Sequence, residues 1–172
     1  MQTALYAVAL GGNQRHPRHG TPLETLRLAC RTLENMPGVR VLAVSRFYRT
    51  APLGPKQGAY VNAAVLIRSD LRPPELLGHL QALEAAFGRV RRRRWGPRVL
   101  DLDIVAATVI WPTNRGRQSG RALRVPHAAM HTRAFVLRPL CDIWPDWRHP
   151  LLHCTARQLC ARQSRRGIVP VA

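Results

Sequence analysis

The stretch from residue 94 to residue 104 constrains the fold of this chain most strongly, because an arginine-rich turn passes directly into a strand with acidic side chains. Residues 94–98 read Arg-Trp-Gly-Pro-Arg, and residues 100–104 read Leu-Asp-Leu-Asp-Ile. Successive side chains of a strand point to opposite faces, so the three apolar residues enter a core while Asp101 and Asp103 project from the other side. The fold must therefore bury one face of this strand and place two neighbouring carboxylates on the other.

Paired carboxylates next to arginines predict a particular chemistry. Neighbouring carboxylates repel each other unless a cation lies between them, and Mg²⁺ typically binds one or two carboxylates together with substrate phosphates. Arg94 and Arg98 carry planar guanidinium groups that bind phosphate oxygens in pairs, and Trp95 can cover a flat ring. The stretch predicts a site for a metal-bound polyphosphate, with Asp101 and Asp103 as metal ligands. An ordinary amphipathic edge strand is the alternative for the Leu-Asp alternation alone, but it does not explain the preceding tryptophan and arginines.

The same stretch resembles the signature of the 6-hydroxymethyl-7,8-dihydropterin pyrophosphokinases, folate-pathway enzymes that move pyrophosphate from ATP onto a pterin alcohol. Further matching motifs follow in the family's order, at residues 10–13, 47–55, 60–64, 125–127 and 130–137. The resemblance covers roughly residues 4–147. It implies an ATP-dependent pyrophosphokinase with two Mg²⁺ ions, whose small-molecule substrates are ATP and 6-hydroxymethyl-7,8-dihydropterin.

The resemblance implies a pterin pocket. A pterin is a flat heterocycle with donors and acceptors along its edge, so it needs aromatic faces and amide groups. By resemblance, Tyr60 and Phe135 sandwich the ring, while Asn62 and main-chain groups near Thr50 and Leu53 bond its edge. The other implied pterin contacts are Gly12, Ala51 and Trp95. The alternative is that Tyr60 and Phe135 are core aromatics and that Gly-Gly-Asn at residues 11–13 only marks a turn.

A nucleotide site is implied on the arginine-rich side of the strand. In the family a mobile loop closes over ATP, brings the residues matching Arg89 and Arg98 to the phosphates, and excludes water. Arg89, Arg98, Asp101 and Asp103 are the implied catalytic residues. The implied ATP contacts are Gln81, Glu84, Arg91, Arg94, Trp95, Arg98, His127 and Arg133.

Glu84 also stands out without the resemblance. It lies near the C-terminal end of an expected helix, where the helix dipole disfavours a carboxylate. A functional role and a surface ion pair with Arg91 or Arg92 are both compatible with this position. The individual roles of Arg91 to Arg93 stay open.

Local patterns predict the order of secondary structure. Strands are expected at 3–10, 39–48, 60–67 and 100–104. Helices are expected from Thr21 for about four turns, from Pro73 to the stop at Gly88, and from near His127. The order strand–helix–strand–strand–helix–strand predicts an α+β, ferredoxin-like split βαβ sheet with helices on one face. The resemblance adds extra C-terminal helices. We expect one domain over residues 1–172, with a peripheral tail from about residue 148.

The composition leaves a second class of function open. The 27 basic residues, all arginine except Lys56, oppose nine acidic residues and give a formal charge of +18. Such a balance is typical of proteins that bind nucleic acids or acidic ligands, although solvated arginine from a GC-rich genome also explains it. A ferredoxin-like nucleic-acid module needs exposed sheet aromatics, whereas this chain lacks an RNP1-like run and carries two acids on a central strand. Nucleic acid is therefore not expected as the main partner.

The sequence also leaves a third class of protein open, and it lacks two common phosphate-binding motifs. A degenerate, non-catalytic family member is a third possibility, because Gly12 replaces the usual serine, Ala128 departs from the family pattern and residues 112–124 are poorly patterned. Neither a G-x-x-x-x-G-K-[ST] loop nor a G-x-G-x-x-G fingerprint occurs, so ATP is expected to be held by arginines, metal and loops.

The remaining features concern the cellular setting. The four cysteines form no C-x-x-C pair and are expected to be reduced thiols. The apolar run at residues 4–10 is too short for a bilayer span or a signal core. The sequence therefore predicts a cytoplasmic protein without a membrane partner. It does not determine the oligomeric state, for which a monomer is the expectation.

Overall fold

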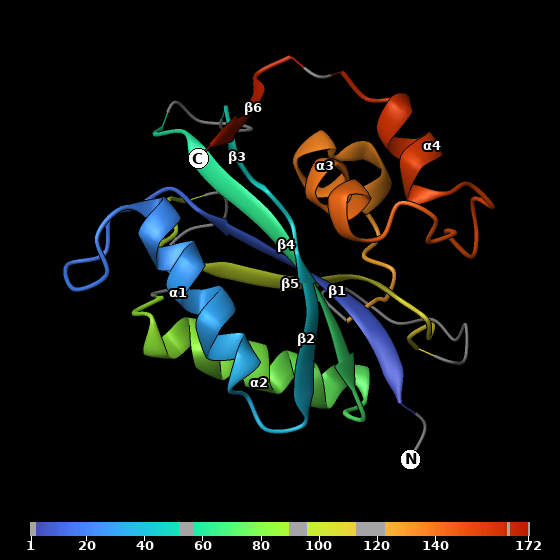
Figure 1. Ribbon diagram of the computed structural model, residues 1–172, viewed down its shortest axis with the longest axis horizontal. Helices are drawn as coiled ribbons and strands as arrows, with labels where there is room; N and C mark the ends of the chain where they lie inside the picture. The colour runs from blue at the N-terminus through green and yellow to red at the C-terminus, as the bar shows by residue number, and fades with distance from the viewer. Residues whose placement is uncertain (1–2, 52–56, 90–95, 113–122, 165, 172) are drawn as a thin grey trace.

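The computed structural model describes residues 3–51, 57–89, 96–112, 123–164 and 166–171. Within them the chain forms one sheet with helices on both faces (Figure 1). The elements are β1 (Ala4–Gly12), α1 (Pro22–Glu34), β2 (Val39–Val44), β3 (Phe47–Thr50), β4 (Tyr60–Ser69), α2 (Pro73–Ala86), β5 (Asp101–Ala107), the 3-10 helix η1 (Met130–Thr132), α3 (Ala134–Ile143), α4 (Ala156–Ala161) and β6 (Ile168–Val171). None of the helices in these ranges has the length and apolar character needed to cross a bilayer.

The sheet has the predicted ferredoxin-like topology. All its strand pairs are antiparallel, and β1 lies between β5 and β4. Both β2 and β3 pair with β4, one after the other along its length, and β6 adds to the outer edge of β3. With β2 and β3 counted as one interrupted strand, the spatial order is fourth, first, third, second, which is the order of the split βαβ fold.

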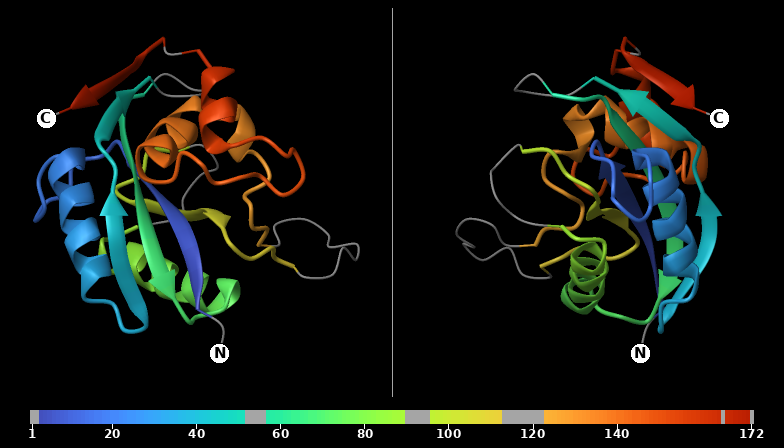
Figure 2. Two further views of the ribbon diagram at one scale, coloured as in Figure 1. Left: turned by 45° about the vertical axis from the view of Figure 1, so that its right-hand side comes forward. Right: turned by 90° about the vertical axis from the view of Figure 1, so that its left-hand side faces the viewer.

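Helices cover both faces of the sheet (Figure 2), and a separate hydrophobic core lies under the helices of each face. Alternate residues of β1, including Tyr6 and Leu10, enter the core under α1 and α2, while Ala7 enters the core under α3 and α4. Ala7 and Ala106 are fully buried, and such small side chains allow α3 to approach the sheet closely. The C-terminal helices expected from the resemblance are therefore present, and they pack on the face opposite α1 and α2.

The ends of the two central helices follow from their sequences. Thr21 caps α1 through a capping box, in which its hydroxyl accepts from the Glu24 N–H and the Glu24 carboxylate accepts from the Thr21 N–H. Helix α2 ends just before Gly88, whose φ of 73° lies in the left-handed region that glycine adopts without strain. This ending turns the chain toward Arg89 and the site.

Some elements differ from their predicted bounds. The predicted strand 39–48 is divided into β2 and β3 by Ser45 and Arg46. The helix expected from near His127 is a turn and a 3-10 helix first, and α3 begins at Ala134. After residue 148 the chain forms α4, in which Leu159 is buried, and then β6, which pairs with β3.

Enlarging Ala7 tests the close packing of α3 on the sheet. Ala7→Leu should lower the free energy of unfolding by about 1–3 kcal/mol, because the added atoms have no space between β1 and α3. Chemical denaturation measures this change. The same substitution at Ala82, which is exposed on α2, is the control and should leave the midpoint nearly unchanged. Equal midpoints for the two variants would contradict the packing.

Candidate active site

The paired aspartates lie at the start of β5, beside the end of β1. In the register of these strands Asp101 is opposite Gly11 and Asp103 is opposite Ala9. Leu102 and Ile104 are buried in the core under α1 and α2. The predicted alternation is therefore present, and both carboxylates project from the face of β5 opposite α1 and α2.

Two arginines hold the carboxylate of Asp101. The Nη2 of Arg89 lies 2.7 Å from Oδ1 of Asp101, and Nη1 of Arg98 donates a hydrogen bond to Oδ2. Arg89 also forms an ion pair with Glu84, and its own side chain is only 15 % exposed. Charge-assisted contacts of this kind are short and directional. They connect the end of α2, the turn at Arg98 and the first residue of β5.

Glu84 lies beneath this cluster. Its side chain is 3 % exposed, and its Oε1 accepts hydrogen bonds from the Leu102 N–H, at 2.6 Å, and from Arg89. Burial raises the pKa of the Glu84 carboxyl, although the Leu102 N–H and the Arg89 charge act in the opposite direction. Glu84 therefore supports Arg89 and β5 from inside the protein. The partners considered from the sequence, Arg91 and Arg92, lie outside the described residues.

Asp103 and His127 form the other side of the cluster. Burial, followed by the negative charge of Asp101, raises the pKa of the Asp103 carboxyl. Burial lowers the pKa of the His127 imidazole, and the charge of Asp103 opposes that shift. The His127 N–H donates to the Val105 carbonyl, which anchors the histidine beside β5. A cation next to the two aspartates would relieve their repulsion and favour the ionised form of Asp103.

Asn13 is a structural component of the site that the sequence did not single out. Its Oδ1 accepts from the Arg98 N–H at 2.8 Å, and its own N–H donates to the Arg98 carbonyl at 2.9 Å. Its Nδ2 donates to the Gly58 carbonyl at 3.2 Å. One side chain thus fixes the Arg98 turn and the segment that leads to Tyr60. Its place at the end of the Gly-Gly-Asn motif was the available signal.

Gly12 is required by the approach of another backbone segment. A Cβ at this position would lie 2.4 Å from the Val99 carbonyl oxygen, closer than real Cβ atoms come to such an atom. Glycine stands here in place of the family's usual serine. In this structure the position has no space for any side chain unless the segment at Val99 moves.

Four of the expected pterin residues, Thr50, Tyr60, Asn62 and Phe135, lie on β3, β4 and α3. Thr50 and Tyr60 are opposite each other at the ends of β3 and β4, and Asn62 donates from Nδ2 to Thr50 Oγ1 at 2.7 Å. Burial raises the pKa of the Tyr60 hydroxyl, which also lies within the electrostatic reach of Arg98 and Asp101. Phe135 is half-buried in the first turn of α3, with the Arg133 guanidinium carbon 6.0 Å from its ring centroid.

The structure brings together some predicted residues and leaves others apart. Six of them form the cluster just described, namely Glu84, Arg89, Arg98, Asp101, Asp103 and His127. Gln81 and Ala51 are exposed. The expected contacts Leu53, Arg91, Arg94 and Trp95 lie outside the described residues. Within the described ranges no three His, Cys, Asp or Glu side chains gather into a metal site.

Paired carboxylates next to guanidinium groups suit enzymes that transfer phosphoryl or pyrophosphoryl groups, where positioning and charge stabilisation dominate catalysis. The α+β fold and this cluster fit an enzyme of that class. The family model described as 7,8-dihydro-6-hydroxymethylpterin-pyrophosphokinase (HPPK) matches residues 7–145 of the chain. The chain therefore belongs to this family.

Individual relatives agree with the family match. The chain is 41 % identical over 165 residues to the 2-amino-4-hydroxy-6-hydroxymethyldihydropteridine pyrophosphokinase of Synechocystis, covering 96 % of this chain and 79 % of that protein. It is 44 % identical over 146 residues to the protein of the same name from Pseudomonas aeruginosa, covering 83 % of this chain and 82 % of that one.

Solved structures share the fold. Wild-type Plasmodium falciparum HPPK-DHPS with pteroate matches with a TM-score of 0.69 at 13 % identity. The match covers 94 % of this chain but only 44 % of the Plasmodium chain. At this identity the likeness concerns the fold alone.

Removing the buried carboxylate tests whether Glu84 supports the cluster. Glu84→Ala should lower the free energy of unfolding by about 2–4 kcal/mol, because it leaves the Leu102 N–H and Arg89 without this acceptor. Glu84→Gln keeps an acceptor and should lose about half as much. Urea denaturation measures both changes. Glu34→Ala, at the exposed end of α1, should leave the midpoint unchanged. A Glu84→Ala protein as stable as the parent would contradict this assignment.

Proposed function

We propose that the cluster around Asp101 is the centre at which this chain transfers pyrophosphate from ATP to the hydroxymethyl group of 6-hydroxymethyl-7,8-dihydropterin, giving AMP and the pterin diphosphate. The observation that carries the assignment is the position of Asp101 between Arg89 and Arg98, directly beside Asp103. Family membership supplies the activity, and this geometry supports the residues that perform it.

Asp101 and Asp103 fit a magnesium site. They are hard oxygen donors on one face of β5. Burial and, after it, the charge of Asp101 raise the pKa of the Asp103 carboxyl, and a divalent cation would remove the repulsion between the two carboxylates. When bound, Mg²⁺ supplies charge neutralisation at the phosphate oxygens. We assign both aspartates as its protein ligands and expect two ions, as the family resemblance implies.

Arg89 and Arg98 are expected to exchange partners when the nucleotide binds. Without ligand, Arg89 and Arg98 neutralise Asp101, so the negative charge on β5 is partly balanced. A triphosphate offers guanidinium groups stronger, bidentate partners. We infer that both arginines transfer to the phosphates as the nucleotide binds, which frees the Asp101 oxygens for the cation. In the reaction they stabilise the charge that develops on the transferred group.

Three residues position the pterin. Tyr60 and Phe135 supply aromatic surface for the ring, and Asn62 supplies an amide for its edge. The Asn62 amide is held by Thr50, so it is oriented before the ligand arrives. The hydroxymethyl group then attacks the β-phosphorus in line. No strong general base is required, because this kind of transfer depends mainly on positioning and electrostatics.

Neutralising the two aspartates tests the catalytic assignment. Asp101→Asn and Asp103→Asn should each lower turnover by several orders of magnitude, because each removes a charged ligand beside a triphosphate. Magnesium-dependent release of AMP measures turnover, and pterin binding alone should survive. The control Asp70→Asn changes an exposed aspartate away from the cluster and should keep full activity. Substantial turnover in both site variants, with tighter RNA binding, would instead favour a nucleic-acid function for this strand.

Truncating Tyr60 tests the pterin pocket. Tyr60→Ala should weaken pterin binding by about tenfold or more, because the ring loses one stacking face. Binding of a non-hydrolysable ATP analogue should stay nearly unchanged. Tyr60→Phe is the matched variant, since it keeps the aromatic face and should bind the pterin almost normally. If fluorescence titration shows equal weakening for both ligands in Tyr60→Ala, the pocket assignment is wrong.

A further inference from the structure

We infer that Asp142 is a positioning residue for the pterin pocket, because its carboxylate fixes α3, which carries Phe135, to the strand that carries Thr50. The inference rests on the proposed function, in which these two residues belong to the pterin site. Asp142 lies in the last turn of α3, away from the carboxylates and arginines of the catalytic cluster.

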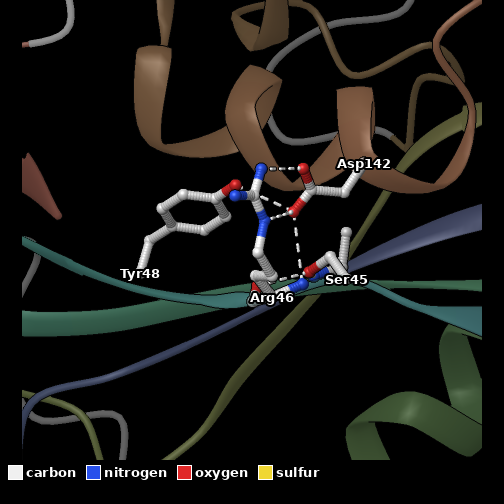
Figure 3. Close-up of polar contacts among 5 residues, drawn as sticks. Ser45, Arg46, Tyr48 and Asp142 are labelled. Carbon is white, nitrogen blue, oxygen red and sulfur yellow. Dashed lines mark hydrogen bonds and ion pairs between the residues drawn. The ribbon is translucent and has the colours of Figure 1, made fainter. Parts of the chain in front are cut away.

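Four hydrogen bonds converge on the Asp142 carboxylate (Figure 3). Its Oδ1 accepts from Nη2 of Arg46 at 2.7 Å, and its Oδ2 accepts from Nε of the same guanidinium group at 3.2 Å. Oδ2 also accepts from the Tyr48 hydroxyl at 2.8 Å and from the Arg46 backbone N–H at 3.2 Å. The residue as a whole is exposed, but these groups leave its side chain only 17 % exposed. The Asp142 carboxylate therefore makes more contacts, and is more buried, than the carboxylate of a simple surface ion pair.

The contacts on the sheet side come from the interruption between β2 and β3. Ser45 stays bound to β4, since its N–H donates to the Ala64 carbonyl and its hydroxyl accepts from the Ala64 N–H. At Arg46 the backbone N–H donates to Asp142 of α3. The chain then enters β3, which carries both Tyr48 and Thr50. A shift of the Asp142 carboxylate would therefore act directly on the strand that ends at Thr50.

The helix geometry links Asp142 to Phe135. Seven residues separate them, which is close to two turns, so both side chains lie on nearly the same face of α3. Seven residues correspond to about 10 Å along the helix axis. Leu137 and Leu140, on the opposite side of α3, pack in the core that includes Ala7. Fixing one end of the face fixes the rotation of α3, and with it the position of Phe135.

The position of Asp142 in its helix indicates that the carboxylate does not serve the helix itself. A carboxylate in the last turn faces the negative end of the helix dipole, which is unfavourable. Burial also raises the pKa of the Asp142 carboxyl, but the hydrogen bonds from Arg46 and Tyr48 more than offset this effect and lower the pKa overall. The side chain is thus ionised at neutral pH, and the four hydrogen bonds described above come from Arg46, between β2 and β3, and from Tyr48 in β3.

Asp142→Asn tests the inference, with Asp146→Asn as the matched control. Asp146 lies four residues later, also pairs with an arginine, Arg157, and has an 83 % exposed side chain. In Asp142→Asn the amide cannot accept both guanidinium bonds, so we expect the dissociation constant of the pterin to rise about five- to tenfold. The dissociation constant of a non-hydrolysable ATP analogue should change less than twofold. Asp146→Asn should bind both ligands as the parent does.

The measurements are pterin fluorescence titration, nucleotide titration and the Michaelis constants for AMP release, each corrected for the active fraction. A purely structural role would weaken both ligands equally or reduce only the active fraction, and either result would overturn the inference. An unchanged pterin dissociation constant would do the same. Failure of the parent protein to release AMP from ATP and the pterin would count against the proposed function, which separates the two tests.

A milder variant covers the possibility that Asp142→Asn folds poorly. Tyr48→Phe removes one of the four hydrogen bonds and leaves the ion pair in place. It should weaken the pterin by about two- to threefold, with no effect on the nucleotide. The double variant Tyr48→Phe/Asp142→Asn should weaken pterin binding less than the product of the single effects, because both act through one carboxylate. Independent effects of the two substitutions would contradict the inference.

Discussion

The Asp101 carboxylate lies between the guanidinium groups of Arg89 and Arg98, and the organisation of the site depends on this interaction. It joins Arg89, just after α2, and Arg98 to the first residue of β5. Among the described residues, three carboxylates, from Glu84, Asp101 and Asp103, lie beside the two guanidinium groups of Arg89 and Arg98. Burial and, after it, the negative charge of Asp101 raise the pKa of the Asp103 carboxyl. A cation would offset the negative charge of these carboxylates, and a phosphate chain would offer the arginines new partners.

Much of the fold could be predicted from local sequence. The alternation in β5 and the order of strong strands and helices were sufficient for the ferredoxin-like sheet, because each of these elements buries a clear apolar face. The break between β2 and β3 could not be predicted in this way. It depends on Arg46 meeting Asp142, which is 96 residues away, and no local pattern reports such a pairing. The bounds of the short α4 and the strand β6 were not predicted from local pattern either, since elements of this size have little periodicity of their own.

The candidate site, like the fold, could be predicted from the sequence only in part. The aspartates and arginines stand in one continuous motif, so their charge and spacing were visible in the sequence. Glu84 attracted attention because of its unfavourable place in a helix, but its described partners, Arg89 and the Leu102 N–H, follow from tertiary packing. Asn13 was overlooked because asparagine after two glycines is ordinary in a turn. Only the structure shows that its side chain connects two other segments. Contacts between residues of different elements therefore could not be predicted from the sequence alone.

The central position of β1 also has a consequence for how the protein is made. Residues 4–12 are synthesised before the other strands of the sheet, yet one of their edges pairs with β5, where Gly11 lies opposite Asp101. That edge therefore has no native partner on the nascent chain until residues 101–107 have been synthesised. Pairings between segments so distant in sequence form slowly, and an unpaired strand edge is prone to incorrect association. We expect the aspartates to reach their place late in biogenesis, so that a truncated or stalled chain lacks the site even when α1 and α2 have already formed.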